Sequence, residues 1–439
     1  MENSSNPKLI FALPAYLVGL SFTNHLQTVL FFPTLFLFFL VRRNDWGIGS
    51  KEFATALLFF LLGLSIYLYL PIRSANSPLA NWGATSELDN FRRHVSGWQY
   101  RVWMFQLSSS QVWENFLSAL KIIAGQFHLL SPLLFLIGLI FCKNSKVFLW
   151  GLLLLGAVTI CYNINYDIND IDVYYLPAVF VLYLLGGVGA LSILARSETS
   201  KQKSNFTKAL TLLLALFFTI NSLASGWAKA DRSQNHFAQE AVENIYQSGP
   251  NGGLIFTAAW DHYAPWLYNH FVLGKRPDLI MLDISLARYS WYLDFLKQAY
   301  PDFVAGSEKQ MDSARALIHQ FEKGLPFNSA VIEAAYQSML ASILRQNIQK
   351  HPVYFDVSTH FDSAAGWFSI PEGVLFRLYP KLAYYPFETP RLDFPEAKNS
   401  IFLEDPIVRR EVESLNRMLD LRRSYEAAAA SFKSNTGNK

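Results

Sequence analysis

The sequence predicts a multi-span α-helical membrane domain followed by a soluble α/β domain with a small parallel or mixed sheet. The 439 residues are 51% hydrophobic and only 16% charged, whereas soluble proteins carry about 25% charged residues. Apolar runs fill the first half, and strand and helix patterns alternate in the second. We therefore expect a transmembrane domain over residues 1–227, an exported α/β domain over 228–400 and a helical tail over 401–439.

The membrane domain is predicted from runs of apolar residues. A helix needs about 20 such residues to cross the hydrocarbon. Five runs have nearly this length, and two shorter ones near the N-terminus are interpreted as a hairpin. The seven runs are 9–22, 28–41, 53–72, 122–141, 147–163, 173–194 and 206–225. A cleavable signal peptide is the alternative for the first run, but no small-residue cleavage site follows it.

Lys and Arg predict the orientation, because they are retained on the cytoplasmic side. They gather in the loops after residue 41, at 143–146 and at 195–208. The turn at 167–172 and the segment 73–121 are therefore predicted to lie outside, although the latter contains several arginines. We expect an integral membrane protein, in the bacterial inner membrane, with a periplasmic or extracellular C-terminal domain.

The net charge and the cysteines exclude other classes. The formal net charge is +3, which is too small to indicate a nucleic-acid partner. Cys142 and Cys161 lie in or beside apolar runs, so neither a disulfide framework nor a zinc site is predicted.

The segment 86–105 has the spacing of an amphipathic helix. Its apolar residues recur every three or four positions, from Leu88 to Phe105. Its other faces carry Arg92, Arg93, His94, Gln99 and Tyr100. Two interpretations stay open with even weight: a helix lying on the membrane with its arginines on lipid phosphates, or arginines that hold the phosphate of a lipid-linked substrate.

Polar residues at two predicted outer turns are further candidates. Asn24 and His25 stand between apolar runs, where ionisable groups often serve a site, although a helix cap is the alternative. Asp167, Asp170 and Asp172 fall in one turn. A solvated acidic turn is favoured over a metal site there, because no fourth ligand is apparent; no metal or other cofactor is predicted.

The C-terminal half predicts strands at 254–260, 279–285, 352–358 and 373–379, with helices between them, including 329–349, and a last helix at 405–432. Helices alternating with buried strands are typical of a sheet with parallel strands. The half lacks G-x-G-x-x-G, G-x-S-x-G, H-E-x-x-H and C-x-x-C motifs. We therefore interpret it as a binding or scaffolding module.

Several motifs together resemble a known family. GLSFTNHLQTVLFFP, YLYLPIRSANSPLANWGATSELDNFRRHVSGWQY, NYDINDIDVYYLPAVFVLYLLGGVG and GLIFTAAWDHYAPWLYNHFVLGKRPDLIMLDIS resemble the transmembrane protein O-mannosyltransferases that act on IPT domains in animals, and their bacterial homologues, formerly a domain of unknown function. The most specific part is the N-W-G stretch with Asn81 and Trp82.

The resemblance implies a partial GT-C glycosyltransferase fold, a polyprenyl-phosphate sugar donor and an exported protein or glycan acceptor. On that basis Arg73 and the arginines of 86–105 would hold the donor phosphate, with Asn24 near the reacting groups and His25 as the candidate catalytic residue. The family's acidic motif in an earlier outer loop is not matched in this sequence. We accordingly expect the chain to lack the N-terminal part and to bind a donor without transferring its sugar alone.

Two other classes of protein are alternatives. The first is a non-catalytic membrane protein that binds a glycan or a peptide through its exported domain. The second, a transporter, is disfavoured because no predicted span carries buried charges.

Overall fold

The computed structural model describes residues 7–43, 49–126, 131–142, 146–168, 170–196, scattered positions within 209–233, 235–359, 366–392 and 405–436. The chain divides into two units. Met1–Ser77 and Gly83–Asn221 form the first, the helical unit, while Pro78–Trp82 and Ser222–Lys439 form the second, the C-terminal unit.

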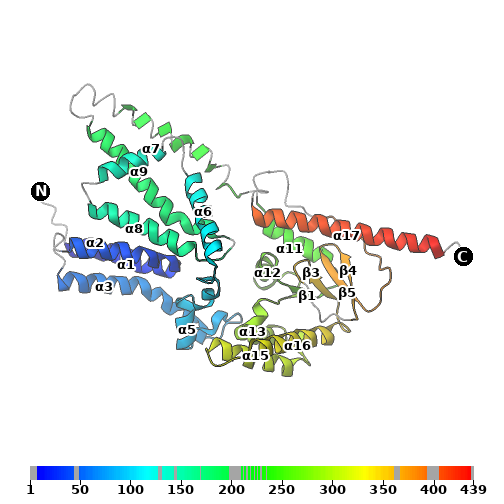
Figure 1. Cartoon of the computed structure of the whole chain (residues 1–439). Helices are drawn as coiled ribbons and strands as arrows, with labels where there is room; N and C mark the ends of the chain where they lie inside the picture. Colours follow the sequence, from blue (N-terminus) through cyan, green and yellow to red (C-terminus); the bar gives the residue numbers. More distant parts are fainter. Residues whose placement is uncertain are drawn as a thin grey trace. The chain divides into compact units, whose positions relative to one another are not determined.

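The helical unit consists of helices joined by short 3₁₀ turns (Figure 1). Its α-helices are α1 (Pro7–Asn24), α2 (Phe32–Arg42), α3 (Ser50–Leu64), α4 (Tyr69–Ala75), α5 (Leu88–Val95), α6 (Ser109–Gly125), α7 (Ser131–Phe141), α8 (Lys146–Asn163) and α9 (Leu176–Arg196). The 3₁₀ turns used below are η1 (Leu26–Phe31), η4 (Trp98–Trp103) and η6 (Ile171–Tyr175).

Three helices among the described residues are long and apolar enough to cross a membrane: Ser50–Ala75, Lys146–Asn163 and Ile171–Ile193. They confirm a multi-span helical membrane domain. Shorter apolar helices cover Leu26–Val41 and Ser131–Phe141. The run predicted at 122–141 is not one described helix, because its first residues belong to the end of α6. Most of the run at 206–225 lies outside the described residues.

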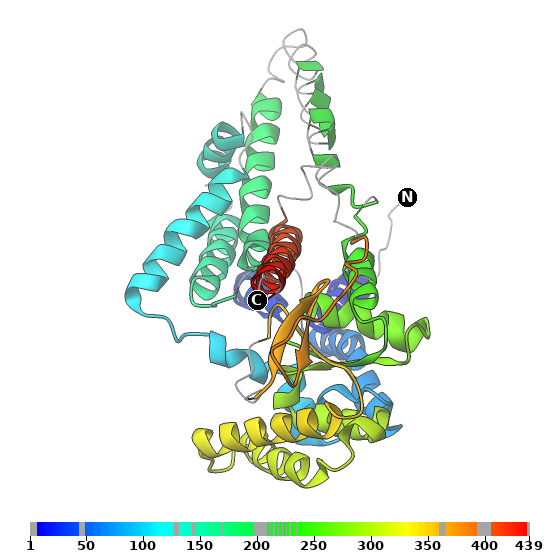
Figure 2. The same cartoon turned by 90° about the vertical axis from the view of Figure 1, so that its right-hand side faces the viewer.

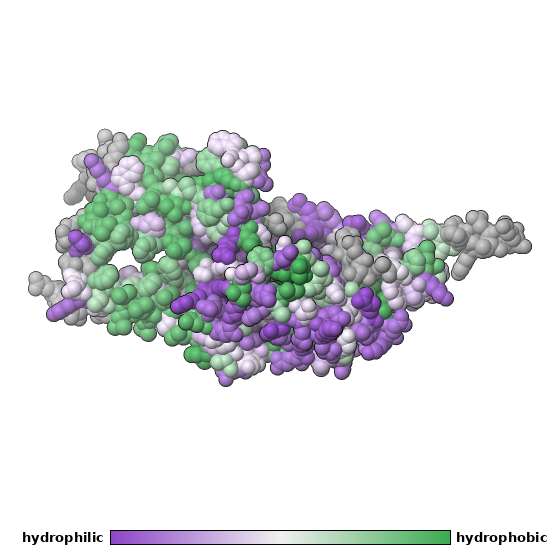
Figure 3. Space-filling model, turned by 60° about the horizontal axis from the view of Figure 1, so that its bottom comes forward, coloured by the Kyte–Doolittle hydropathy of each residue, from purple (hydrophilic) through white to green (hydrophobic). Residues whose placement is uncertain are grey.

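Glycines let helices of this unit approach closely. A Cβ at Gly138 of α7 would overlap the carbonyl oxygen of Leu185 in α9. Similarly, a Cβ at Gly63 of α3 would overlap the carbonyl oxygen of Tyr16 in α1. Small residues at helix contacts are typical of membrane helices, where packing drives association. Outside these contacts, hydrophobic residues cover much of the visible face of the unit (Figure 3), as lipid contact requires.

The single amphipathic helix expected over 86–105 is divided in two, which corrects that expectation. Helix α5 ends at Val95, and Gly97 adopts a left-handed conformation with φ +64°. Residues Trp98–Trp103 then form η4, which is a 3₁₀ helix. Glycine adopts positive φ at little cost, so the break falls where the sequence permits it.

The described residues of the C-terminal unit form one mixed sheet. Its strands are β1 (Gly253–Thr257), β2 (Leu279–Asp283), β3 (Val353–Asp356), β4 (Phe368–Glu372) and β5 (Leu375–Tyr379), in the order β2-β1-β3-β5-β4. Strands β2, β1 and β3 are parallel, whereas β5 pairs antiparallel with both β3 and β4. This confirms the predicted α/β domain with a small mixed sheet.

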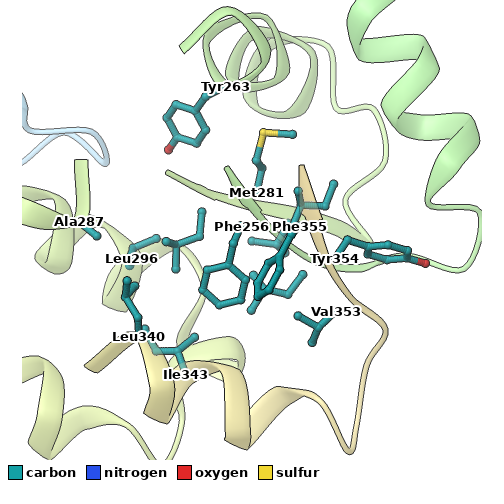
Figure 4. Close-up of a cluster of buried hydrophobic side chains, with 14 of the residues drawn as sticks. Phe256, Tyr263, Met281, Ala287, Leu296, Leu340, Ile343, Val353, Tyr354 and Phe355 are labelled. Carbon is teal, nitrogen blue, oxygen red and sulfur yellow. The ribbon is translucent and has the colours of Figure 1, made fainter. Parts of the chain in front are cut away.

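Helices surround this sheet and supply most of the core. They are α11 (Phe237–Ser248), α12 (Trp260–Leu267), α13 (Ser290–Ala299), α14 (Pro301–Val304), α15 (Glu308–Glu322), α16 (Ser329–Asn347) and α17 (Pro406–Thr436). Helices α15 and α16 lie side by side (Figures 1 and 2). Leu340 and Ile343 of α16 lie beside Phe256 of β1, while Met281 of β2 is directed toward Tyr263 of α12 (Figure 4).

Strand β4 is the element that the sequence analysis missed. Its sequence, FSIPE, contains Pro371 and has two exposed residues at its start. Proline cannot donate a hydrogen bond, so it is confined to sheet edges. Strand β4 occupies such an edge and pairs with β5 alone, which explains both the tolerated proline and the weak strand signal.

Candidate functional site

Two segments that are distant in the sequence meet in the helical unit. Met104, after η4, forms an isolated antiparallel bridge with Tyr166, after α8. The Phe105 N–H donates to the carbonyl oxygen of Asn165 at 2.8 Å, and the Asp167 N–H donates to that of Trp103 at 2.9 Å. These backbone bonds place the acidic turn beside η4.

A cavity of about 600 Å³ lies where these segments meet. Its walls combine aromatic rings with two carboxylates. The lining residues are Tyr100, Trp103, Tyr166, Asp167, Ile168, Asp170 and Tyr174. A volume of this size accommodates a small-molecule ligand.

Gln27 of η1 and Asn163 at the end of α8 hold Tyr174 in place. Its carbonyl oxygen accepts hydrogen bonds from Gln27 Nε2 at 2.5 Å and from Asn163 Nδ2 at 2.7 Å. The Tyr174 ring stands edge-on to the rings of Tyr166 and His25, at 5.6 and 5.3 Å between centroids. His25 therefore contacts a residue of the cavity wall but does not itself line the cavity.

The electrostatics of the cavity are acidic. Asp167 and Asp170 are exposed to solvent, so their carboxylates can accept hydrogen bonds from a ligand. Burial, and to a lesser degree the neighbouring Tyr174 and Tyr100, raises the pKa of Tyr166 well above its usual value, which keeps the phenol protonated as a hydrogen-bond donor. In the described part of the chain, no three His, Cys, Asp or Glu side chains gather as a metal site.

A second cavity, of about 330 Å³, lies elsewhere in the helical unit. It is largely apolar, and burial lowers the pKa of its one histidine, His94. The lining residues are Thr23, Leu26, Ile66, Tyr67, Tyr69, Leu70, His94, Val95 and Gly97. A neutral imidazole in such a wall favours an apolar ligand group over a charged one.

The arginines are arranged around Trp98. The guanidinium groups of Arg93 and Arg101 stand 4.7 and 4.0 Å from the centroid of its ring. Nη1 of Arg93 is buried and has no hydrogen-bond partner among the described residues. By contrast, Arg92 is exposed and lies 4.0 Å from the carboxylate of Asp89.

The sequence-predicted residues thus fall in several places. Tyr100 lines the larger cavity, His94 lines the smaller one, and His25 caps η1 by accepting the Gln27 N–H at 3.2 Å. Trp82 belongs to the C-terminal unit, where it packs against Trp260 and Trp291. The following predicted residues line neither of these two cavities: Asn24, Arg73, Asn81, Arg92, Arg93 and Gln99.

Sequence reasoning did not assign Trp103, Tyr166 or Tyr174 to a site, and it interpreted Asp167 and Asp170 as a solvated turn. One available signal was the alternation of Tyr and Asp in NYDINDIDVYY. Such a mixture beside an apolar run is unusual for a turn that only faces water, because tyrosine side chains bring large apolar surfaces.

Comparison with known proteins finds a relative of this chain. Protein O-mannosyl-transferase TMEM260 of Mus musculus is 25% identical to it over an alignment of 318 residues, and the alignment covers 66% of this chain and 44% of the mouse protein. The chain therefore spans less than half the length of that relative. No family model matches the chain, and no solved structure matches it. The similarity agrees with the resemblance to protein O-mannosyltransferases.

Proposed function

We propose that this chain is a membrane glycosyltransferase that transfers a sugar, mannose or another hexose, from a polyprenyl-phosphate donor to a hydroxyl of an exported protein or glycan. The observation that carries the proposal is the aromatic and acidic cavity beside Tyr100. The similarity to a protein O-mannosyl-transferase supports it. The apolar helices indicate a membrane protein, and the Lys and Arg pattern supports an exported side for the cavity.

The cavity has the chemistry that a sugar requires. Carboxylates accept hydrogen bonds from sugar hydroxyls, and the faces of Tyr100 and Trp103 offer flat apolar surface to the C–H groups of a pyranose. The rings around Tyr174 hold the walls in place before a ligand arrives. Preformed walls lower the entropy cost of binding.

Transfer also requires a base. The sequence analysis identified none and expected no transfer by the chain alone, whereas Asp167 and Asp170 in the cavity lining are candidate bases, so we propose transfer by this chain instead. The acceptor oxygen would attack the anomeric carbon, while the bond from that carbon to the phosphate oxygen breaks. The acceptor proton would pass to one carboxylate, and polyprenyl phosphate would leave with the bonding electrons. General-base catalysis of this kind contributes about 10²–10⁴-fold to a rate.

Arg93 is the best candidate for the donor phosphate. Its buried Nη1 lacks a partner among the described residues, and an unpaired buried donor is costly unless a ligand completes it. Its position over Trp98 fixes the plane of the guanidinium, which suits bidentate phosphate binding. The second cavity, lined by Ile66, Tyr67 and Leu70 of a candidate span, would receive the first isoprene units.

The test uses the full chain in proteoliposomes with undecaprenyl-phosphate mannose and a Ser/Thr-rich peptide. We expect Asp167→Asn or Asp170→Asn to lower turnover about 100-fold or more. Asp172→Asn is the matched control, because Asp172 belongs to the same turn but does not line the cavity, and its turnover should stay within about twofold of the parent.

Two results would contradict the proposal. Unchanged turnover in both Asp167→Asn and Asp170→Asn would remove the cavity as the reaction site. Donor binding without any transfer, in the parent chain as in the variants, would favour a non-catalytic membrane protein that binds a glycan or peptide.

A further inference from the structure

The C-terminal unit exposes an unusual group of large apolar side chains at the end of α12. The helix continues into η8 (Tyr268–Val272), a single turn of π-helix. Four residues here, which we call the apolar tip, are strongly exposed: Tyr268 at 56%, Phe271 at 41%, Val272 at 66% and Leu273 at 48%. Four such residues within six positions are more than scattered exposed apolar residues, and such a group indicates an interaction site.

Ring contacts and backbone hydrogen bonds hold the base of the tip against the core of the unit. Phe271 contacts the rings of Trp266 and Phe295 in the core, at 6.3 and 5.8 Å between centroids. The Leu273 N–H donates to the carbonyl oxygen of Tyr268 at 3.2 Å, and the Lys275 N–H donates to that of Asn269 at 2.9 Å. The exposed side chains are therefore presented by an ordered backbone and do not belong to a loose loop.

The residues around the tip have the composition that is typical of segments at a lipid surface. From His262 to Pro277 the sequence contains no Asp or Glu, and the carboxylate that follows, Asp278, is paired with Arg276. Lys275, next to the tip, is exposed. A tyrosine, aliphatic side chains and a lysine are the composition of segments that lie at the level of the headgroups, where the cation meets anionic lipids.

The chain path limits how far α12 can lie from the end of a candidate span. Trp82, which packs in the C-terminal unit, stands 6.0 Å from Trp260 at the start of α12, measured between ring centroids. Trp82 follows the end of the candidate span Ser50–Ala75 by seven residues, and seven residues reach at most about 25 Å. Tyr268 lies eight residues further along α12 than Trp260, which is about 12 Å of helix.

From these observations we infer that the apolar tip inserts into the headgroup region of the membrane and holds the C-terminal unit against the lipid surface. The partner is the bilayer itself, with anionic headgroups beside Lys275. This role is independent of the glycosyltransferase proposal, because it requires no sugar donor and no acceptor.

Another exposed apolar group in the unit provides a matched comparison. Leu325 and Phe327, in the turn between α15 and α16, are each 53% exposed. This turn follows Glu322 and Lys323, so charges of both signs flank it. Leu325 is thus about as exposed as the tip residues, but a glutamate and a lysine lie three and two residues before it. Ser313 of α15 is an exposed polar position.

The experiment measures the depth of single labels in the full chain. Cys142 and Cys161 are replaced by Ala, and a cysteine is introduced in turn at Val272, Leu325 or Ser313 and labelled with an environment-sensitive fluorophore. The protein is reconstituted in vesicles of phosphatidylcholine and phosphatidylglycerol that contain a shallow doxyl-lipid quencher. We expect quenching at position 272 to exceed that at 325 and at 313 by about twofold or more. A label at Leu273→Cys provides a second measurement of quenching within the tip.

Two outcomes would overturn the inference. Equal quenching at 272, 325 and 313 would show that the tip has no preference for lipid. A blue-shifted label at 272 that doxyl lipid does not quench would show that protein, either this chain or a second copy, covers the tip instead.

Discussion

In the C-terminal unit, His262 joins α17 to the end of strand β3 through two hydrogen bonds. Its Nδ1 lies 3.2 Å from Oδ2 of Asp356, at the end of β3, and its Nε2 lies 2.9 Å from Oε2 of Glu411, in α17. All three side chains are buried. Burial alone lowers the pKa of His262, but the hydrogen bonds to Asp356 and Glu411 outweigh it and raise the pKa to about 10.

The raised pKa of His262 determines how much this residue stabilises the folded unit and how that stabilisation depends on pH. A histidine titrates near pH 6.5 in the unfolded chain, so the stability that His262 contributes is fully present below that pH and is lost as pH rises through about 10. About three and a half pK units, at 1.36 kcal/mol each, set an upper bound of about 5 kcal/mol. Removing one partner of a buried ion pair costs about 3–5 kcal/mol, which agrees with that bound.

We therefore expect His262→Gln to lower the free energy of unfolding by about 3–5 kcal/mol near pH 7, and by much less near pH 10.5. The assay is urea unfolding of residues 230–439 at both pH values, followed by circular dichroism. Ser313→Gln, at an exposed site of α15, is the control. A loss below about 1 kcal/mol near pH 7, or a loss that does not change with pH, would refute the assigned ion pair.

Two further predictions concern packing. Ending the chain after Tyr379 should prevent cooperative unfolding of the C-terminal unit or lower its melting temperature by more than about 10 °C, because α17 buries Leu415 and supplies Glu411; an unchanged thermal transition would contradict this. Gly138→Val should reduce the folded yield of the full chain in detergent, whereas Gly187→Val should not. The first Cβ would overlap the backbone of α9, and the second meets nothing within 4 Å, so equal yields would contradict the close helix contact.

The sheet was largely predictable from sequence because two of its parallel strands, β1 and β2, are fully buried, although β2 lies at an edge of the sheet. Every residue of β1 and β2 is buried, and such strands appear as continuous apolar runs. The strand predicted at 373–379 is β5, which pairs antiparallel with β3, with Phe355 opposite Phe376. Strand β4 was missed because its first two residues are exposed and it contains Pro371, so neither the periodicity nor the composition marks it. The other edge strand, β2, is fully buried and was predicted.

The candidate site was less predictable, because its parts are joined by contacts between distant residues. Met104 and Tyr166 pair across 62 residues, and no periodicity of either segment reports that register. The pattern of 86–105 predicted that Tyr100 lies on the face of one continuous helix. In the structure the helix is interrupted at Gly97, and Tyr100 belongs to the separate 3₁₀ helix η4. The residue types of the site were visible in the sequence, but their proximity to one another was not.

The backbone around Tyr100 indicates why this segment departs from a regular helix. Phe105 adopts φ +57°, a conformation that is unfavourable for a residue with a Cβ and that persists only where the surroundings impose it. Its N–H bond to Asn165 and the neighbouring bond from Asp167 to Trp103 do so. Irregular backbone beside membrane spans is tolerated where it lines a water-accessible cavity. The strain at Phe105 thus accompanies the contact that places Tyr100 and Asp167 on one cavity wall, and a continuous helix through 105 would separate them.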